Sequence, residues 1–277
     1  MVWILPVFIF LLGLCIGSFL NVVILRLETS QSLSGRSHCP HCKHILGWKD
    51  LFPVFSYLFL RGKCAYCSQK ISWQYPITEI STALIFLLIL NFEFGISNSM
   101  EVFNIINLAF LFYITSSLIV ILVYDLKHYI IPDKILFPAI FIAFVYRLFE
   151  NSVIYSLNSN FKFQISNFAH LGNYFLAIII ASGFFLAIFL VSKGQWMGFG
   201  DVKLAILLGL ILGFPEILLA LTLAFFFGAI IGVSMMLLKK GGLKSQIPFA
   251  PFLISGTFVA LLWGNQIISW YMNFLYI

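Results

Sequence analysis

The chain has 277 residues, of which 61% are hydrophobic and only 9% are charged, and its mean hydropathy is +1.03. This composition excludes a water-soluble enzyme, because a soluble domain needs a largely polar surface. The formal net charge of +6 is carried by loops between long apolar runs, so it does not indicate a nucleic-acid partner. We therefore expect a polytopic membrane protein surrounded by lipid.

About eight apolar segments are predicted to be transmembrane helices, because a hydrocarbon core about 30 Å thick needs about 20 apolar residues to cross it. In chain order they cover residues 3–25, 77–95, 102–124, 130–148, 169–191, 202–214, 217–238 and 247–272. The sixth segment is the shortest and ends at Gly213-Phe214-Pro215. The predicted fold class is all-α, with one small polar module between the first two transmembrane helices.

The chain is expected to divide into three parts. Residues 1–25 form the first transmembrane helix, residues 26–76 form a polar loop large enough for a small module, and residues 77–277 form a core of seven transmembrane helices. A second polar stretch, residues 149–168, is rich in Asn and Ser and is predicted to be an outer loop.

The basic residues predict the orientation in the membrane, because cytoplasmic loops are enriched in Lys and Arg. An even number of spans puts both termini on one side. If that side is outside the cytoplasm, only Arg147 and Lys162 of the 16 Lys and Arg residues lie outside. We therefore predict that both termini lie outside and that the polar loop 26–76 is cytoplasmic.

Four of the five cysteines form two C-x-x-C pairs in this cytoplasmic loop. They are Cys39, Cys42, Cys64 and Cys67. Their spacing is typical of a four-thiolate zinc ribbon, and metal binding would supply folding energy that so small a loop lacks. Four protein ligands leave no open position, so the zinc is expected to be structural. The alternative of disulfides or redox pairs is disfavoured because stable disulfides are uncommon in the cytoplasm.

Two of the ten acidic residues stand at the cytoplasmic ends of predicted helices: Asp125 after the third apolar segment and Asp201 before the sixth. Two carboxyl groups that share a site hold one proton between them, as in aspartic proteases. One then activates water while the other polarises a peptide carbonyl. Gly198 and Gly200, beside Asp201, would let the backbone approach a substrate strand. The alternative is that Asp125 and Asp133 are ordinary interfacial charges and Asp201 caps a helix.

These motifs resemble those of bacterial type IV prepilin peptidases, also called prepilin leader peptidase/N-methyltransferases. The resemblance covers nearly the full length. The matching stretches, in the family's order, are Gly17 to Ile24 with Arg26, the two cysteine pairs, Tyr75 to Glu79, Asp125 to Asp133, Gly198 to Leu204, and Ile247 to Phe249 with Pro251 and Phe252. Ala250 departs from the Gly that family members commonly have there, and this departure is not expected to touch a catalytic group.

The resemblance implies an intramembrane aspartic endopeptidase of the bacterial inner membrane. Its substrates are prepilins and pseudopilins of type IV pilus, type II secretion or DNA-uptake systems, which it cuts after a glycine at the cytoplasmic face. It also implies N-methylation of the new N-terminal residue, typically Phe, with S-adenosylmethionine. The family's catalytic aspartates fall on Asp125 and Asp201, and Asp133 falls on a supporting position. The residues that bind the methyl donor, and the oligomeric state, are not indicated.

Two other functions compete with this interpretation. A proton-coupled transporter would use Asp125 and Asp201 as a relay, although transporters usually place such groups near the membrane midplane. A membrane-anchored zinc-ribbon scaffold without catalysis would need the cysteines and not the aspartates.

Overall fold

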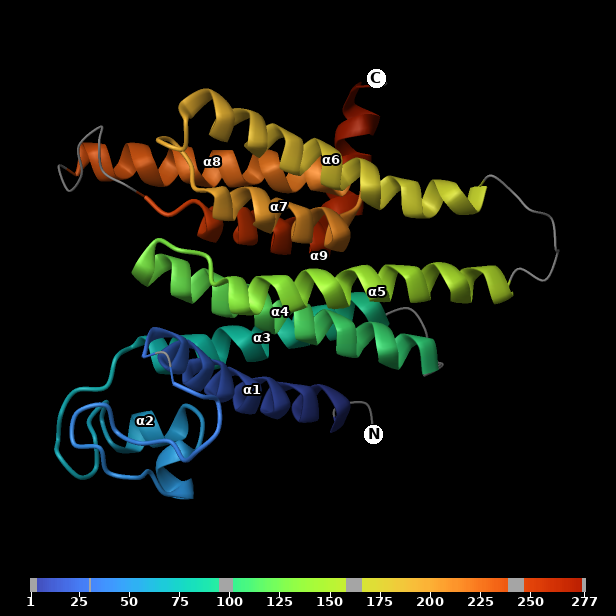
Figure 1. Ribbon diagram of the computed structural model, residues 1–277. Helices are drawn as coiled ribbons and strands as arrows, with labels where there is room; N and C mark the ends of the chain where they lie inside the picture. Colours follow the sequence, from blue (N-terminus) through green and yellow to red (C-terminus); the bar gives the residue numbers. More distant parts are fainter. Residues whose placement is uncertain (1–3, 30, 95–101, 158–165, 239–246, 276–277) are drawn as a thin grey trace. The chain divides into compact units, whose positions relative to one another are not determined.

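The computed structural model describes residues 4–29, 31–94, 102–157, 166–238 and 247–275. They are largely helical (Figure 1). The elements are α1 (Ile4–Glu28), the 3₁₀ helix η1 (Trp48–Leu51), α2 (Phe55–Phe59), α3 (Gln74–Phe94), α4 (Val102–His128), α5 (Asp133–Leu157), α6 (Ser166–Ser192), α7 (Phe199–Leu212), α8 (Glu216–Leu237) and α9 (Ala250–Leu275). Within these ranges the only extended pairing is two isolated bridges, so the predicted all-α class is confirmed.

Each apolar segment predicted from the sequence coincides with a helix, but the helices differ in length. In the described part of the chain, seven helices are long and apolar enough to cross a membrane, and α7 is not one of them. Its 14 residues extend about 21 Å at 1.5 Å per residue, which is less than the hydrocarbon thickness of about 30 Å. Gly213, with φ of +75°, ends α7. The predicted sixth span is therefore a helix too short to cross by itself.

The predicted outer loop is shorter than expected. Residues 149–157 continue α5, since apolar residues persist beyond Arg147, and residues 158–165, with Lys162, lie outside the described residues. Arg147, which the charge argument counted on the outer side of the membrane, is a buried residue of α5.

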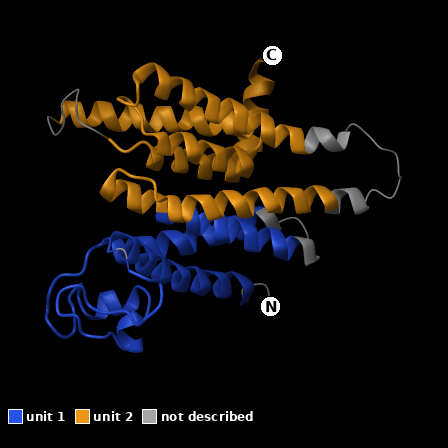
Figure 2. Ribbon diagram, in the orientation of Figure 1, with its two compact units in different colours: residues 1–120 blue, residues 121–277 orange. Residues whose placement is uncertain are grey.

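The chain forms two compact units, residues 1–120 and 121–277 (Figure 2). The first unit holds α1, the cysteine-bearing module, α3 and most of α4. The second holds the end of α4 and the helices from α5 to α9.

In the first unit, α1 and α3 pack at very close range. A Cβ placed on Gly13 would lie 2.5 Å from the Cα of Ala83, and one on Gly17 would lie 2.6 Å from the Cα of Glu79. Small residues four apart let two helix backbones approach in lipid, where packing replaces the hydrophobic effect. This pair was visible in the sequence as G-x-x-x-G, and its role in packing was not predicted.

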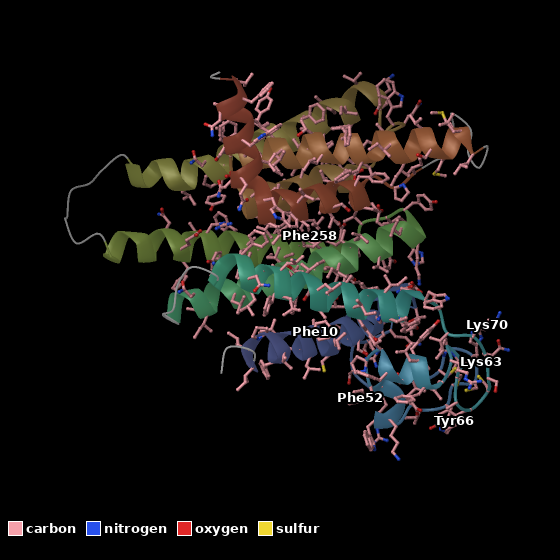
Figure 3. All side chains as sticks on the ribbon, turned by 180° about the vertical axis from the view of Figure 1, so that it is seen from behind. Phe10, Phe52, Lys63, Tyr66, Lys70 and Phe258 are labelled. Carbon is pink, nitrogen blue, oxygen red and sulfur yellow. The ribbon has the colours of Figure 1, made fainter. Side chains whose placement is uncertain are left out.

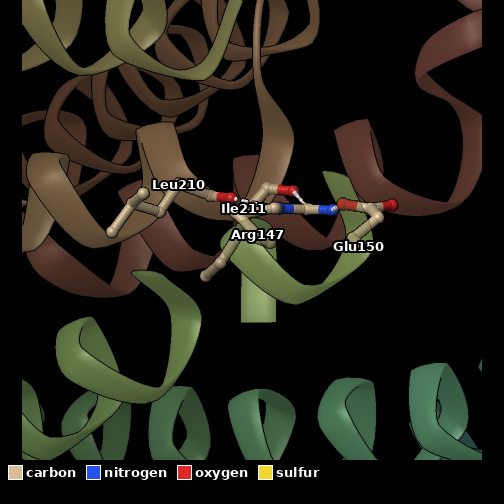
Figure 4. A network of polar contacts seen from close by, with 4 residues as sticks. All are labelled: Arg147, Glu150, Leu210 and Ile211. Carbon is tan, nitrogen blue, oxygen red and sulfur yellow. Dashed lines mark hydrogen bonds and ion pairs between the residues drawn. The ribbon is translucent and has the colours of Figure 1, made fainter. Parts of the chain in front are cut away.

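In the second unit, α7 is held by helices on both sides. A Cβ on Gly209 would lie 2.8 Å from the amide nitrogen of Ile178, so α6 approaches α7 closely. From α5, the Arg147 side chain reaches the end of α7, donating from Nε to the carbonyl of Leu210 (2.8 Å) and from one terminal nitrogen to that of Ile211 (2.6 Å). Its other terminal nitrogen lies 2.6 Å from Glu150 (Figure 4).

Arg147 thus satisfies carbonyl groups that a helix leaves unpaired in its last turn. Its positive charge also complements the negative end of the α7 dipole. The guanidinium carbon lies 4.1 Å from the ring centroid of Tyr174, which covers it from α6. The sequence offered no local signal for this contact, because Arg147 lies 63 residues before Leu210.

Candidate catalytic and metal sites

Asp201 lies in the first turn of α7, and its local structure explains how it is held. Gly198 is the N-cap residue, with an extended backbone, so Asp201 is the third residue of the helix. Its carboxylate accepts a hydrogen bond from the Gly198 amide, and its own amide donates to the Gly198 carbonyl (3.2 Å). This reach-back from the third residue is a helix-capping interaction. The cap role considered from the sequence is therefore present, and it also fixes the direction of the side chain.

Asp125 lies near the end of α4, which stops where Tyr129 adopts a φ of +57°. The carboxylate accepts a hydrogen bond from the backbone amide of Ala250, the first residue of α9. A helix N-terminus offers unpaired amides and a partial positive charge, and both suit a carboxylate. The expectation that position 250 touches no candidate catalytic group is wrong. The Gly-to-Ala departure leaves this donor intact, because the donor belongs to the backbone.

The carboxyl groups of Asp125 and Asp201 are both buried, and the negative charge of Asp125 acts on Asp201. Both are buried, with 5% of Asp125 and 9% of Asp201 exposed. Burial, and after it the negative charge of Asp125, raise the pKa of Asp201 to about 7, and the Gly198 amide opposes this shift. Asp201 precedes the predicted sixth segment and lies in none of the seven candidate spans. The helix ends that carry the two residues lie at the same end of the second unit (Figure 1).

Contacts beside Asp201 hold the start of α7 against the segment that follows α4. A Cβ on Gly200 would lie 3.3 Å from side-chain carbons of Ile131, tighter than nearly all ordinary contacts. Lys203 donates to both carboxylate oxygens of Asp133, at 2.8 and 2.9 Å. Gly200 therefore serves close packing here, and Asp133 is an exposed ion-pair partner. The approach of a substrate strand to Gly198 and Gly200 stays a prediction.

The four cysteines of the first unit come together as the spacing predicted. The sulfur atoms of Cys39, Cys42, Cys64 and Cys67 all lie within 4.8 Å of one another. Those of Cys39 and Cys67 are 3.9 Å apart. A tetrahedral thiolate site with bonds of about 2.3 Å has its sulfurs about 3.8 Å apart. The donor set therefore fits a metal ion such as zinc.

The two cysteine pairs have the same backbone geometry. The amide of Cys39 donates to the carbonyl of His44 (3.0 Å), and the amide of Cys64 donates to that of Gln69 (2.9 Å). The residue that follows each second cysteine, Lys43 or Ser68, has a positive φ, 60° or 56°. Each pair thus sits on a tight turn that points both thiols inward.

The protonation chemistry of Cys39 suits metal binding. Burial by itself would raise the pKa of the Cys39 thiol, but hydrogen bonds from the backbone amides of Cys42 and His41 and from neighbouring thiols lower it to about 7. The amide of Gln69 lowers the pKa of Cys67, but burial and hydrogen bonds with the same thiols outweigh it and raise that pKa to about 11. Metal ions bind the thiolate form, which the shifts favour at Cys39 and disfavour at Cys67.

Several residues of the N-terminal motifs connect the module to its two flanking helices. Buried Arg26 donates to the carbonyls of Ser32 (3.1 Å) and Gly35 (2.7 Å), where the chain leaves α1. Asn21 donates to the Tyr75 carbonyl at the start of α3 (3.1 Å). Sequence reasoning recognised these residues only through the family resemblance, and the structure gives them a role in attaching the module.

Comparison with known proteins agrees with these sites. Residues 11–92 match the family described as Bacterial Peptidase A24 N-terminal domain, and residues 111–233, which include both aspartates, match the Type IV leader peptidase family. No solved structure shows a significant match.

Curated relatives from several bacteria bear the name prepilin leader peptidase/N-methyltransferase, and three of them illustrate the similarity. The protein from Bacillus subtilis (strain 168) is 32% identical, over 96% of this chain and 97% of the relative. That from Pseudomonas aeruginosa is 31% identical (95% and 92%), and that from Aeromonas hydrophila is 29% identical (99% and 96%). With this similarity over nearly the whole of both sequences, the chain belongs to the prepilin leader peptidase/N-methyltransferase family.

Proposed function

We propose that this chain cleaves the leader peptides of prepilins or pseudopilins with Asp125 and Asp201 as its catalytic pair, and then methylates the new N-terminus. The observation that carries the proposal is the pair of buried carboxyl groups, each fixed by a backbone amide and each within electrostatic reach of the other. The relatives provide the substrate class by their names. The same relatives give no support to the transporter alternative.

In this proposal Asp201 holds the proton and Asp125 is the base. The ionised carboxylate of Asp125 removes a proton from water, and the resulting hydroxide attacks the carbonyl carbon of the scissile bond. The carboxyl proton of Asp201 goes to the carbonyl oxygen as negative charge develops there. The tetrahedral intermediate then collapses as Asp125 gives its proton to the nitrogen of the leaving amine and Asp201 takes a proton from a hydroxyl group of the intermediate. The carbon–nitrogen bond breaks, and both aspartates return to their starting state.

The position of the aspartates suits a prepilin substrate. A prepilin has a hydrophilic leader followed by an apolar helix, so its cleavage point should lie where cytosol meets lipid. Asp125 and Asp201 belong to helix ends and not to helix centres. Although α7 is short, it runs opposite to both α6 and α8, so it still reverses the direction of the chain between them (Figure 1). We propose that these ends face the cytoplasm in the bacterial inner membrane, with both termini outside, and that residues 77–277 form the peptidase core.

The cysteine module is proposed to serve the second reaction. Zinc held by Cys39, Cys42, Cys64 and Cys67 would cross-link the two turns, and with four protein ligands it has no position for substrate. S-adenosylmethionine supplies the methyl group, which the amine of the cleaved pilin accepts.

The test of the proposed function is one incubation with two readouts. Purified protein in lipid nanodiscs is mixed with a full-length prepilin, with or without S-adenosylmethionine, and the products are weighed by mass spectrometry. We expect loss of the leader in both samples and the additional mass of one methyl group only with the donor. An uncut prepilin would contradict the peptidase assignment. Cleavage without methylation would contradict only the second activity.

Cleavage should depend on pH in a direction set by Asp201. Its carboxyl group stays protonated up to a pKa of about 7, so the shared proton is present below that pH and is lost above it. We expect the rate of leader cleavage to fall about tenfold per pH unit on the alkaline side. The measurement is the initial rate from pH 5 to 9, with circular dichroism to show that the helices persist. A rate that still rises beyond pH 8 would exclude this protonation scheme.

Removing the metal should separate the two activities. Cys39→Ser or Cys64→Ser deletes a buried ligand, so we expect zinc content to fall well below one per chain and methylation to fall with it. Leader cleavage should persist, because both aspartates belong to the other compact unit. Elemental analysis and the mass assay above measure these effects. Cys15→Ser, outside the cluster, is the matched control and should change neither.

A further inference from the structure

The cysteine module exposes a segment rich in large apolar side chains, with Lys49 and Asp50 near its start, that neither proposed reaction uses. We call residues 48–59 the apolar edge. Its exposed large side chains, with their exposed fractions, are Trp48 (75%), Leu51 (39%), Phe52 (53%), Phe55 (47%), Leu58 (62%) and Phe59 (83%). No residue from 51 to 60 is charged. Water-soluble surfaces rarely expose apolar groups so close together, and such patches mark interaction sites.

The outward orientation of α2 is fixed from its other side. Tyr57 donates to the Ile71 carbonyl (3.4 Å), and its ring lies 5.3 Å from that of Trp73. Phe55, Leu58 and Phe59 are spaced i, i+3 and i+4, so they share one helix face. Because Tyr57 faces the module, this shared face points away from it.

The backbone before α2 is held in an unusual conformation. Val54 has a φ of +61°, which is costly for a β-branched residue. Its amide donates to the buried carboxylate of Glu79 on α3, at 2.7 Å. Glu79 thus fixes the apolar edge to a transmembrane helix, close to the start of that helix.

The module cannot leave the membrane surface, since its ends continue into α1 at Glu28 and into α3 at Gln74, both candidate spans. Figure 3 shows Phe52 on the side of the module that faces the shaft of α1, whereas Lys63 and Lys70 lie on the opposite side. Phe52 is therefore separated from Lys63 and Lys70 along the direction of α1, and a transmembrane helix is tilted on average by only about 20° from the membrane normal.

We propose that the apolar edge inserts into the interfacial layer of the cytoplasmic leaflet, with phospholipid as its partner. Short segments rich in Phe, Leu and Trp bury their apolar face about 5–10 Å into the boundary between head groups and acyl chains. Trp48 stands at the start of the segment with Lys49 beside it, a pairing common at head-group level. The segment thereby holds the metal module flat against the bilayer, independently of the peptidase reaction.

Photo-crosslinking in a defined bilayer tests this proposal. Phe52 is replaced by p-benzoylphenylalanine in the full chain, and the protein is placed in nanodiscs of phosphatidylethanolamine and phosphatidylglycerol. A matched variant carries the same group at Lys70, exposed on the opposite side of the module. After irradiation, mass spectrometry counts lipid adducts. We expect at least about tenfold more lipid adduct at position 52 than at position 70.

Each alternative outcome is decisive. Equal lipid labelling at the two positions would overturn the proposal. Labelling of added prepilin at position 52, with loss of the lipid adduct, would also overturn it, because the partner would then be the substrate. If the Phe52 variant does not fold, the same group at Phe59, the most exposed side chain of the edge, gives the same comparison. Zinc content shows that each variant retains its module.

Discussion

Asp125→Asn or Asp201→Asn should each abolish leader cleavage while the protein stays folded. An amide can neither accept the proton of the attacking water nor give a proton to the carbonyl oxygen. Loss of one member of a catalytic pair removes most of what the pair contributes, so we expect the cleavage rate to fall by about 10³-fold or more. The rate is measured under single-turnover conditions with a purified prepilin, and methylation of an already cleaved pilin reports an intact protein.

Asp133→Asn is the matched control for this pair. Asp133 is half exposed and forms a surface ion pair with Lys203, and such pairs contribute about 1 kcal/mol or less. We expect a change in rate of a few-fold at most. Full activity of either the Asp125 or the Asp201 variant would disprove the catalytic pair. A loss at Asp133 as large as theirs would instead make Asp133 a third essential group.

Replacing Arg147 with Met should destabilise the second unit and impair cleavage. Met fills a similar volume, but the carbonyls of Leu210 and Ile211 lose their donors and the carboxylate of Glu150 loses its partner. Removing one member of such a network costs about 3 kcal/mol. We expect a lower denaturation midpoint in a titration with sodium dodecyl sulfate. Cleavage should weaken as well, since α7 carries Asp201 at its other end.

Glu150→Gln separates the two contributions of Arg147. This variant keeps the shape of the ion-pair partner and leaves both carbonyl contacts in place, so its effect should be well below that of the Arg147 variant. Arg147→Lys should be intermediate, because a single ammonium group cannot reproduce the fork of a guanidinium. If all three variants were as stable as the unsubstituted protein, α7 would not depend on the contacts of Arg147.

Local patterns predicted most of the fold. Long apolar runs have the length that a bilayer requires, so each predicted segment is a helix. Cysteine spacing likewise predicted the cluster, because two short turns bring each pair together without help from distant residues. Asp125 and Asp201 were predicted as candidate catalytic residues because an ionised carboxylate near lipid is energetically costly and usually has a function.

What sequence reasoning missed depends on distant partners. Arg147 was counted only as a charge on the outer side, since nothing near it in the sequence indicates that it contacts the end of α7. Hydropathy alone predicted that α7 spans the membrane. The helix is shorter than a span, and it is held among its neighbours by the close approach of Gly209 to α6 and by the contacts of Arg147 with its last turn. Glu79 was assigned no partner, because its partner is a backbone amide in the loop.

The bond from the Ala250 amide to Asp125 has a practical consequence for mutagenesis. Alanine scanning and most other side-chain exchanges at position 250 leave the main-chain N–H in place, so such a survey would report the position as tolerant. Proline alone among the standard residues lacks this hydrogen. Because proline is well accepted in the first turn of a helix, Ala250→Pro would remove the donor while preserving α9, and it exposes a contribution that other replacements conceal.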